Sequence, residues 1–484
     1  MILRLTICFL LTNLSFAQRN FLNVNLEGLK SNNSLKEAYL IKDLNTDNLF
    51  VILEEEKTTH AFKYDANKTL GSQMTSEGLK RKFKEIVGHI VNENQLLLLQ
   101  KNKKGNKLAY IKYNFETKQT EEVEYDLEDS SDRFVESFIT ADKCVLFTIN
   151  TSNEAFKKWE FNIDGSFQVE EINTESLFAS AGISYEPLDF FLVDSQGFSR
   201  VVDLTKVNNK IPNNLEIVTD NNKMYERKKS FLWTIDHYLD YTLVFYFDAP
   251  DYNPVLKLVN KPKLRKNSFN AKSNSFIFDD KIAQVVSSNK ELLIDIKELN
   301  NPSNLIKSIR VDKDADIDFK NSPILQEGSS YSFGGTRKME KTSKLLRKMS
   351  SDDNGISVYK NNDRYHVTIG GTRVQTSGGG APMMATGFSG MPVGHLGGIN
   401  QGYNPTFYAY GMYSNTGSTR IECLFDLDFN HIQGEIDDNV FDRIDDYKDV
   451  EDDLRTESIT YLNSEVIFGY WKPKEFKYYF KIFE

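Results

Sequence analysis

Strand-like runs recur along most of the chain at nearly constant spacing, and this recurrence constrains the fold more than any other feature. Each unit has a short apolar run, a polar loop and a second run rich in aromatic or β-branched residues. Successive units are 50, 48, 41, 44 and 49 residues apart. The positions compared are Tyr64, Asn114, Asn162, Asp203, Phe247 and Ile296. Such a period accommodates four short strands with their turns, which is one blade of a β-propeller.

We therefore predict an all-β protein in which residues 18–484 form a β-propeller of about seven blades. The next strand-like position, Leu427, lies 131 residues beyond Ile296. Without an uncharged insertion at 374–419, the remaining length suffices for one long blade or two short ones. We also expect a strand near the C-terminus, up to Phe483, to pair with an N-terminal strand and close the ring. Paired β-sandwich domains are the alternative, because they would give a similar density of strands.

Local patterns predict individual elements within this scheme. The run Gln95–Gln100 is continuously apolar between its ends and is typical of a strand buried on both faces. Asp164-Gly165 lies between two β-rich runs and predicts a hairpin. Two helices are also expected, at 75–91 and within 339–352. The first expectation rests on apolar residues at helical spacing after a possible cap at Ser76: Leu79, Phe83, Ile86, Val87 and Ile90.

The first 17 residues have the pattern of a secretory signal peptide. Arg4 precedes a short apolar stretch, and small residues lead up to Ala17. The apolar stretch is too short for a comfortable membrane span, and no later run reaches spanning length. We predict cleavage after Ala17, no transmembrane span, and a location in the periplasm or at the cell surface.

Composition and motifs argue against several classes of function. A net charge of −10 disfavours sequence-independent nucleic-acid binding. Asp312 to Asp318 carry carboxylates at alternate positions, but Ile317 and Pro323 replace the Gly and Glu that an EF-hand requires. The acidic run at 435–453 is expected to be a solvated, flexible loop. The six histidines have no zinc-site spacing. We therefore predict no metal, no cofactor and no assignable catalytic residue.

Two cysteines remain after removal of the signal peptide, Cys144 and Cys423. Each lies in an apolar strand-like run. Free cysteine packs as a small hydrophobic residue, so two buried thiols are expected. A single disulfide between distant strands stays open as an alternative in an oxidising compartment.

The insertion at 374–419 differs from the rest of the chain. It has no Asp, Glu, Lys or Arg, yet it contains 11 of the 27 glycines and 4 of the 9 methionines. Its flanks are expected to be strands of one sheet. It could be a flexible glycine-rich loop, a plug or cap for the propeller, or a segment that reaches a partner or a membrane surface. The candidate partner-binding residues are Met383, Met384, Phe388, Met391, Val393, Leu396, Ile399, Phe407, Tyr408 and Tyr410.

Together these patterns predict an exported, non-catalytic binding or scaffold protein of the cell envelope. It would contact an envelope protein or an outer-membrane complex through the 374–419 insertion. The alternative is an exported hydrolase or lyase that acts on polysaccharide or peptide at the propeller face. That alternative stays open because propellers assemble sites from distant loops, without a local motif.

Overall fold

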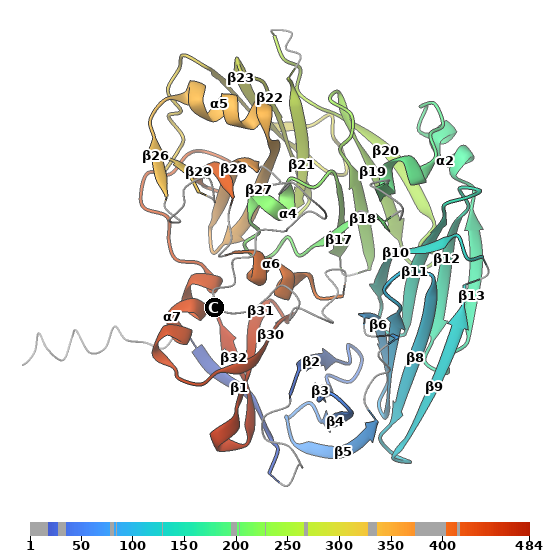
Figure 1. Ribbon diagram of the computed structural model, residues 1–484. Helices are drawn as coiled ribbons and strands as arrows, with labels where there is room; N and C mark the ends of the chain where they lie inside the picture. The colour runs from blue at the N-terminus through green and yellow to red at the C-terminus, as the bar shows by residue number, and fades with distance from the viewer. Residues whose placement is uncertain are drawn as a thin grey trace, which may run out of the picture. The chain divides into compact units, whose positions relative to one another are not determined.

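The computed structural model describes residues 18–27, 35–77, 82–83, 85–127, 129–194, 201–202, 204–227, 229–265, 270–327, 336–372, 403–413 and 417–484. Strands dominate these residues, and the all-β prediction is confirmed (Figure 1). The chain divides into two compact units. Unit 1 comprises the described parts of 1–42, 47–78 and 438–484, and unit 2 comprises 43–46 and 79–437.

Unit 1 contains two four-stranded antiparallel sheets. The first has the order β1-β32-β31-β30 and the second β2-β3-β4-β5. Their strands are β1 (Gln18–Asn25), β2 (Glu37–Lys42), β3 (Leu49–Glu54), β4 (Thr58–Tyr64), β5 (Leu70–Glu77), β30 (Arg455–Leu462), β31 (Glu465–Lys472) and β32 (Lys477–Phe483). A short 3-10 helix, η2 (Pro473–Glu475), links β31 to β32. Because Gln18 of β1 lies opposite Phe483 of β32, the predicted pairing between a C-terminal strand and an N-terminal strand is confirmed.

The acidic run of unit 1 is a helix, so the prediction of a flexible loop is wrong for most of it. Helix α7 (Val440–Val450) begins with a reciprocal capping box between Asn439 and Asp442. Phe441, Ile444 and Tyr447 are buried at helical spacing. The carboxylates occupy the remaining faces, and this apolar stripe supplies the packing that a solvated acidic loop lacks.

Unit 2 contains five sheets of four or five strands and one two-stranded sheet within its described residues. The four-stranded sheets are β6 (Glu85–Val91), β7 (Gln95–Lys101), β8 (Lys107–Asn114), β9 (Gln119–Asp126); β10 (Asp132–Ile139), β11 (Lys143–Asn150), β12 (Phe156–Asn162), β13 (Phe167–Ile172); and β21 (Lys272–Phe278), β22 (Lys281–Ser287), β23 (Glu291–Glu298), β24 (Leu305–Asp312). Each follows chain order from its first strand to its last, and all neighbours are antiparallel.

The other sheets of unit 2 are less regular. One has the order β16 (Thr205–Val207), β17 (Asn222–Arg227), β18 (Ser230–Ile235), β19 (Tyr241–Asp248), β20 (Pro254–Asn260), with β16 parallel to β17. Another has the order β26 (Arg337–Met339), β25 (Ile324–Gln326), β29 (Ser418–Phe425), β28 (Arg364–Thr372), β27 (Asp353–Asn361). β14 (Val193–Asp194) pairs with β15 (Val201–Val202). The pairing of β28 with β29 confirms that the flanks of the insertion belong to one sheet.

Short helices connect the sheets of unit 2. They are α2 (Thr174–Ser180), α3 (Leu188–Leu192), α4 (Leu215–Val218), α5 (Thr342–Ser351) and α6 (Pro405–Tyr413). Helix α5 confirms the helix expected within 339–352. None of the helices in the described ranges is both long and apolar enough to cross a membrane.

The helix predicted at 75–91 is wrong, because its described residues lie largely in β5 and β6. A register shift between Ile86 and Gly88 interrupts the pairing of β6 with β7, and strand β6 is buried on both faces. Ile86, Val87 and Ile90 are therefore all buried in an extended strand. A bulged strand that is buried on both sides places apolar residues at spacings that imitate a helix.

Candidate functional site

The first strands of three sheets in unit 2 bring ionisable side chains together. His89 lies on β6, Glu136 on β10 and Lys206 on β16, and each of these strands is the edge strand of its sheet. Strands β6 and β10 contact each other directly. We call this group the first-strand cluster. It comprises His89, Glu136, Cys144, Lys206, Glu226 and Tyr403.

Lys206 is the centre of the cluster. Its side chain is 1 % exposed, and its Nζ donates to the Ser137 carbonyl at 3.0 Å and pairs with Glu226 Oε1 at 2.7 Å. Burial by itself lowers the pKa of Lys206, but the charges of Glu226 and Glu136 and the hydrogen bond to Glu226 raise it overall. The lysine therefore keeps its charge at neutral pH.

Glu136 has a pKa matched to proton transfer at neutral pH. Its residue is 3 % exposed, and its Oε1 accepts a hydrogen bond from the Ser137 amide at 2.8 Å. Burial raises the pKa of Glu136 to about 7, although the positive charge of Lys206 opposes the rise. Because its two protonation states then have similar populations near pH 7, Glu136 can both accept and donate a proton.

Cys144 lies behind these groups as a buried free thiol, and Cys423 is likewise buried and free, which confirms the expected packing of both. Burial raises the pKa of Cys144 to about 12, so it is not an activated nucleophile. Gly88 makes room for it: a Cβ at Gly88 would lie 2.4 Å from Cys144 Sγ.

His89 and Tyr403 form the more accessible side of the cluster. Both keep partial solvent exposure, and Nδ1 of His89 lies 3.1 Å from the Tyr403 hydroxyl with the rings edge to face. Burial, together with the charge of Lys206, lowers the pKa of His89 to about 3. The imidazole is therefore neutral at physiological pH and serves as a hydrogen-bonding group.

Helix α6 carries the return limb of the insertion and contacts β16 and α4. Asn208 Nδ2 donates to Thr406 Oγ1 at 3.0 Å, and the Asn214 side chain donates to the Met412 carbonyl. Phe407 and Tyr410 are buried, at 7 % and 4 % exposure, and Tyr408 is half-buried. The return limb of the insertion is thus packed on unit 2, and the described residues do not decide among the three alternatives for the segment before it.

The other candidate residues of the insertion lie outside the described residues. They are Met383, Met384, Phe388, Met391, Val393, Leu396 and Ile399. A partner-binding role for all ten residues stays a prediction.

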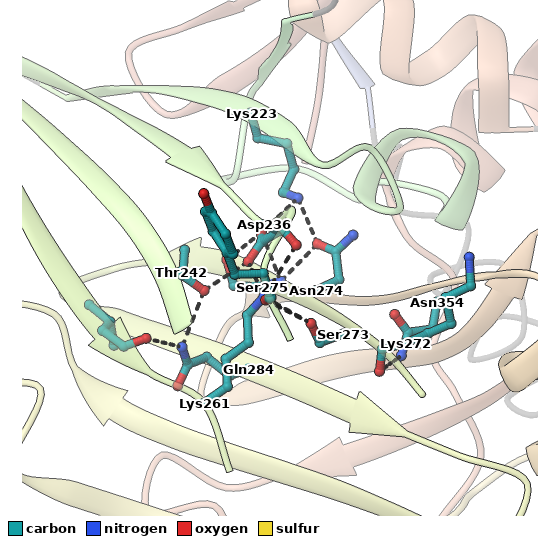
Figure 2. A network of polar contacts seen from close by, with 12 residues as sticks. Lys223, Asp236, Thr242, Lys261, Lys272, Ser273, Asn274, Ser275, Gln284 and Asn354 are labelled. Atoms are coloured by element: carbon teal, nitrogen blue, oxygen red, sulfur yellow. Dashed lines mark hydrogen bonds and ion pairs between the residues drawn. The ribbon is translucent and has the colours of Figure 1, made fainter. Parts of the chain in front are cut away.

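A second buried polar network lies between the sheet of β16–β20 and that of β21–β24 (Figure 2). Asp236 is completely buried, and its carboxylate pairs with Lys261 at 3.0 Å and Lys223 at 3.4 Å. It also accepts hydrogen bonds from Thr242 and Ser275, both at 2.7 Å. Burial favours the neutral acid, but the two lysines dominate and lower the pKa of Asp236 to about 2. This enclosed network joins two sheets and offers no exposed reactive group.

The sequence patterns above did not identify the first-strand cluster. The local signal was weak, since Glu136 lies beside Ser137 in β10 and Lys206 lies between Thr205 and Val207. Nothing local indicated that these strands would meet, because the three residues are separated by 47 and 70 positions.

Comparisons with known proteins place few constraints on function. No family model matches the chain, and no curated protein matches it. Similar solved structures include an ACO/RPE65 chimera, with a TM-score of 0.30 and 7% identity over 59% of this chain and 64% of that one. A mutant of the Synechocystis apocarotenoid oxygenase (ACO) gives the same TM-score and identity over 60% and 64%. The chain thus spans less than two thirds of these structures.

These findings contradict both functional predictions, since the matched structures are oxygenases and not scaffolds, hydrolases or lyases. The prediction of a cell-envelope scaffold is therefore wrong, and so is its alternative of an exported hydrolase or lyase. At this level of similarity no oxygenase residue or activity carries over to the present chain.

A cobalt-substituted Synechocystis ACO is also similar, with a TM-score of 0.29 and 7% identity over 59% of this chain and 64% of that one. Among the described residues, no group of three or more His, Cys, Asp and Glu side chains is placed to hold a metal ion.

Proposed function

We propose that this chain is a seven-bladed β-propeller and that it catalyses proton transfer on a small polar molecule at the first-strand cluster. The observation that carries the proposal is the meeting of Glu136, Lys206 and His89 from the edge strands of three sheets. In a propeller, the first strands of the blades line the central channel, where ligands commonly bind.

The blade assignment is supported by the sheets themselves. Seven sheets of four or five strands occur in the described residues, and β1 completes the sheet of the last three strands. An experimental structure of the mature chain tests it. Seven sheets arranged around one axis are expected, whereas two packed sandwiches would contradict it.

In the proposed chemistry, Glu136 accepts a proton from the substrate or donates one to it. Lys206 stays charged and stabilises negative charge that develops nearby, while the neutral His89 and Tyr403 orient the substrate by hydrogen bonds. Burial around Glu136 limits competition from water.

Proton exchange provides a direct test. The mature chain would be incubated in D₂O at pD 7 with acetone, dihydroxyacetone, pyruvate and acetylacetone, and deuterium uptake followed by ¹H NMR. Glu136→Gln is expected to lower exchange of at least one compound by a factor of roughly 10² or more. The matched control Glu122→Gln, on the exposed face of β9, should exchange as the wild type does. Equal exchange by both variants for every compound would contradict the proposal.

We further propose that the protein works outside the cytoplasm after cleavage behind Ala17. Residues 1–17 lie outside the described residues. N-terminal sequencing of the protein from a culture of the native host tests this. A chain that begins at Gln18 is expected, and retention of Met1 would contradict it.

A further inference from the structure

A group of exposed or partly exposed apolar side chains, most of them aromatic, lies on unit 2, apart from the first-strand cluster. Phe190 of α3 is 65 % exposed, Leu239 is 41 % exposed and Tyr185 is 39 % exposed. Single exposed apolar residues are ordinary, but a contiguous group of them marks an interaction surface. We name this group the aromatic patch, which comprises Tyr185, Phe190, Tyr238, Leu239 and Tyr241.

Ring contacts connect Phe190, Tyr238 and Tyr241. Tyr238 and Tyr241 stack with centroids 4.6 Å apart. Phe191, which is buried, contacts Phe190 at 5.2 Å on one side and Tyr238 at 5.9 Å on the other. These three rings are thus held in place through the buried ring of Phe191, so they form a surface that is ordered before any partner binds.

Carboxylates surround these rings. Tyr185 donates a hydrogen bond to Glu154 at 3.3 Å, and the Tyr238 hydroxyl bonds to the side chain of Glu186. Asp240 lies close enough to act on the Tyr241 hydroxyl. The segments 183–194 and 236–241 contain no Lys or Arg. In the part of the chain that the structure describes, Glu154, Glu186 and Asp240 form no ion pair.

We propose that the aromatic patch binds a cationic segment of a partner protein, in which Arg or Lys side chains lie over the tyrosine rings and pair with Glu186, Glu154 and Asp240. Charge complementarity selects this occupant. Aromatic faces attract cations through their quadrupole, and nearby carboxylates add to the attraction. Tyrosine is also enriched at the centres of protein interfaces, since it offers apolar area together with a polar group.

A pentaarginine peptide, acetylated and amidated, serves as the probe for this site. Its binding to the mature chain would be measured by titration calorimetry at 20 mM and 300 mM NaCl. We expect Phe190→Ala to weaken binding about fivefold or more and Glu186→Gln about threefold, with weaker binding at high salt. A pentaglutamate peptide should not bind.

Matched controls distinguish binding at the aromatic patch from general attraction of the peptide by the net charge of −10. Leu305→Ala removes a 48 % exposed apolar side chain from β24, and Glu122→Gln removes one carboxylate from β9. Both should bind pentaarginine as the wild type does. Losses equal to those of the patch variants would overturn the proposal, because attraction would then be general.

The same variants also test two other possible ligands of the aromatic patch. Self-association in sedimentation equilibrium that Phe190→Ala abolishes, without peptide binding, would assign the patch to a second copy of the chain. Binding of cellohexaose that depends on Phe190, without peptide binding, would assign it to carbohydrate. Either result overturns the cationic partner. Circular dichroism should show that both patch variants fold, since Phe190 is exposed and Glu186 is partly exposed.

Discussion

The two buried charge networks of unit 2 compensate in different ways for placing charged groups away from water. In the Asp236 network, one carboxylate is held by two lysines and two hydroxyls, and Asp236, Lys223 and Lys261 are fully buried (Figure 2). In the first-strand cluster, Lys206 is shared by two carboxylates, of which Glu226 is 40 % exposed. The first network is enclosed by protein, whereas the second extends from the interior towards solvent.

The two carboxyl groups respond in opposite directions to this difference. Two neighbouring cations overcome burial at Asp236 and hold its pKa near 2, whereas one shared cation does not overcome burial at Glu136, whose pKa rises to about 7. A permanently charged Asp236 stabilises the join between sheets. Glu136, which titrates near neutral pH, is suited to chemistry. The number of charged partners and the enclosure, more than burial alone, separate a carboxylate that stays charged from a carboxyl group that titrates near neutral pH.

Removal of the Asp236 charge should have the largest effect. Asp236→Asn leaves Lys223 and Lys261 buried without their anion, so we expect a loss of about 3–5 kcal/mol in the free energy of unfolding. Urea denaturation at pH 7 measures it. Because the folded pKa of Asp236 lies below its usual 3.8, its contribution is present above pH 4 and falls as the pH drops towards 2. A loss below 1 kcal/mol would show that the network is not structural.

Glu136→Gln should have the opposite effect on stability. The wild-type carboxyl is protonated more readily in the folded state, so stability falls as the pH rises from 4.5 to about 7 and then levels off. The variant lacks this dependence. It should match the wild type near pH 4 and exceed it by up to about 3 kcal/mol at pH 8. Urea midpoints over this range measure the difference, and parallel pH profiles would contradict the raised pKa.

A steric test addresses the packing behind the cluster. Gly88→Ala should cost about 1–3 kcal/mol, because its Cβ would lie 2.4 Å from Cys144 Sγ. Adding Cys144→Ala should recover much of this loss, since the next contact, Cys144 Cβ, is 3.7 Å away. A double-mutant cycle measures the coupling. Gly370→Ala is the control without rescue, because there the obstacle is the Thr419 carbonyl at 2.2 Å.

Removal of one hydroxyl from each network compares the two directly, and Tyr403→Phe has the smallest expected effect of all. Thr242→Val leaves a carboxylate oxygen of Asp236 and the Gln284 amide without their shared partner, at a cost of about 1–3 kcal/mol. Tyr403→Phe removes the bond to the partly exposed His89 and should cost about 0.5–1 kcal/mol. Thermal denaturation ranks the two variants. An equal cost would mean that the first-strand cluster is as enclosed as the Asp236 network.

The sequence predicted the strand-rich architecture because apolar runs, β-branched residues and turn signals are local. The hairpin turn at Asp164-Gly165 shows this, since Gly165 adopts a φ of 89°. Prediction failed where local patterns were ambiguous, as in the bulged strand β6 and the acidic helix α7. The site could not be predicted from the sequence, because its members come from separate sheets and none belongs to a recognisable motif.

By itself, the sequence determined the succession of strands, the buried state of both cysteines and the pairing of the two chain ends in one sheet. These follow from hydrophobic patterning, which acts over a few residues at a time. Only the tertiary structure decided that Glu136 lies beside Lys206 and that Asp236 lies between two lysines. A carboxyl group has its ordinary pKa in an extended chain. Its pKa shifts only when folding removes water from around it and places other charges beside it.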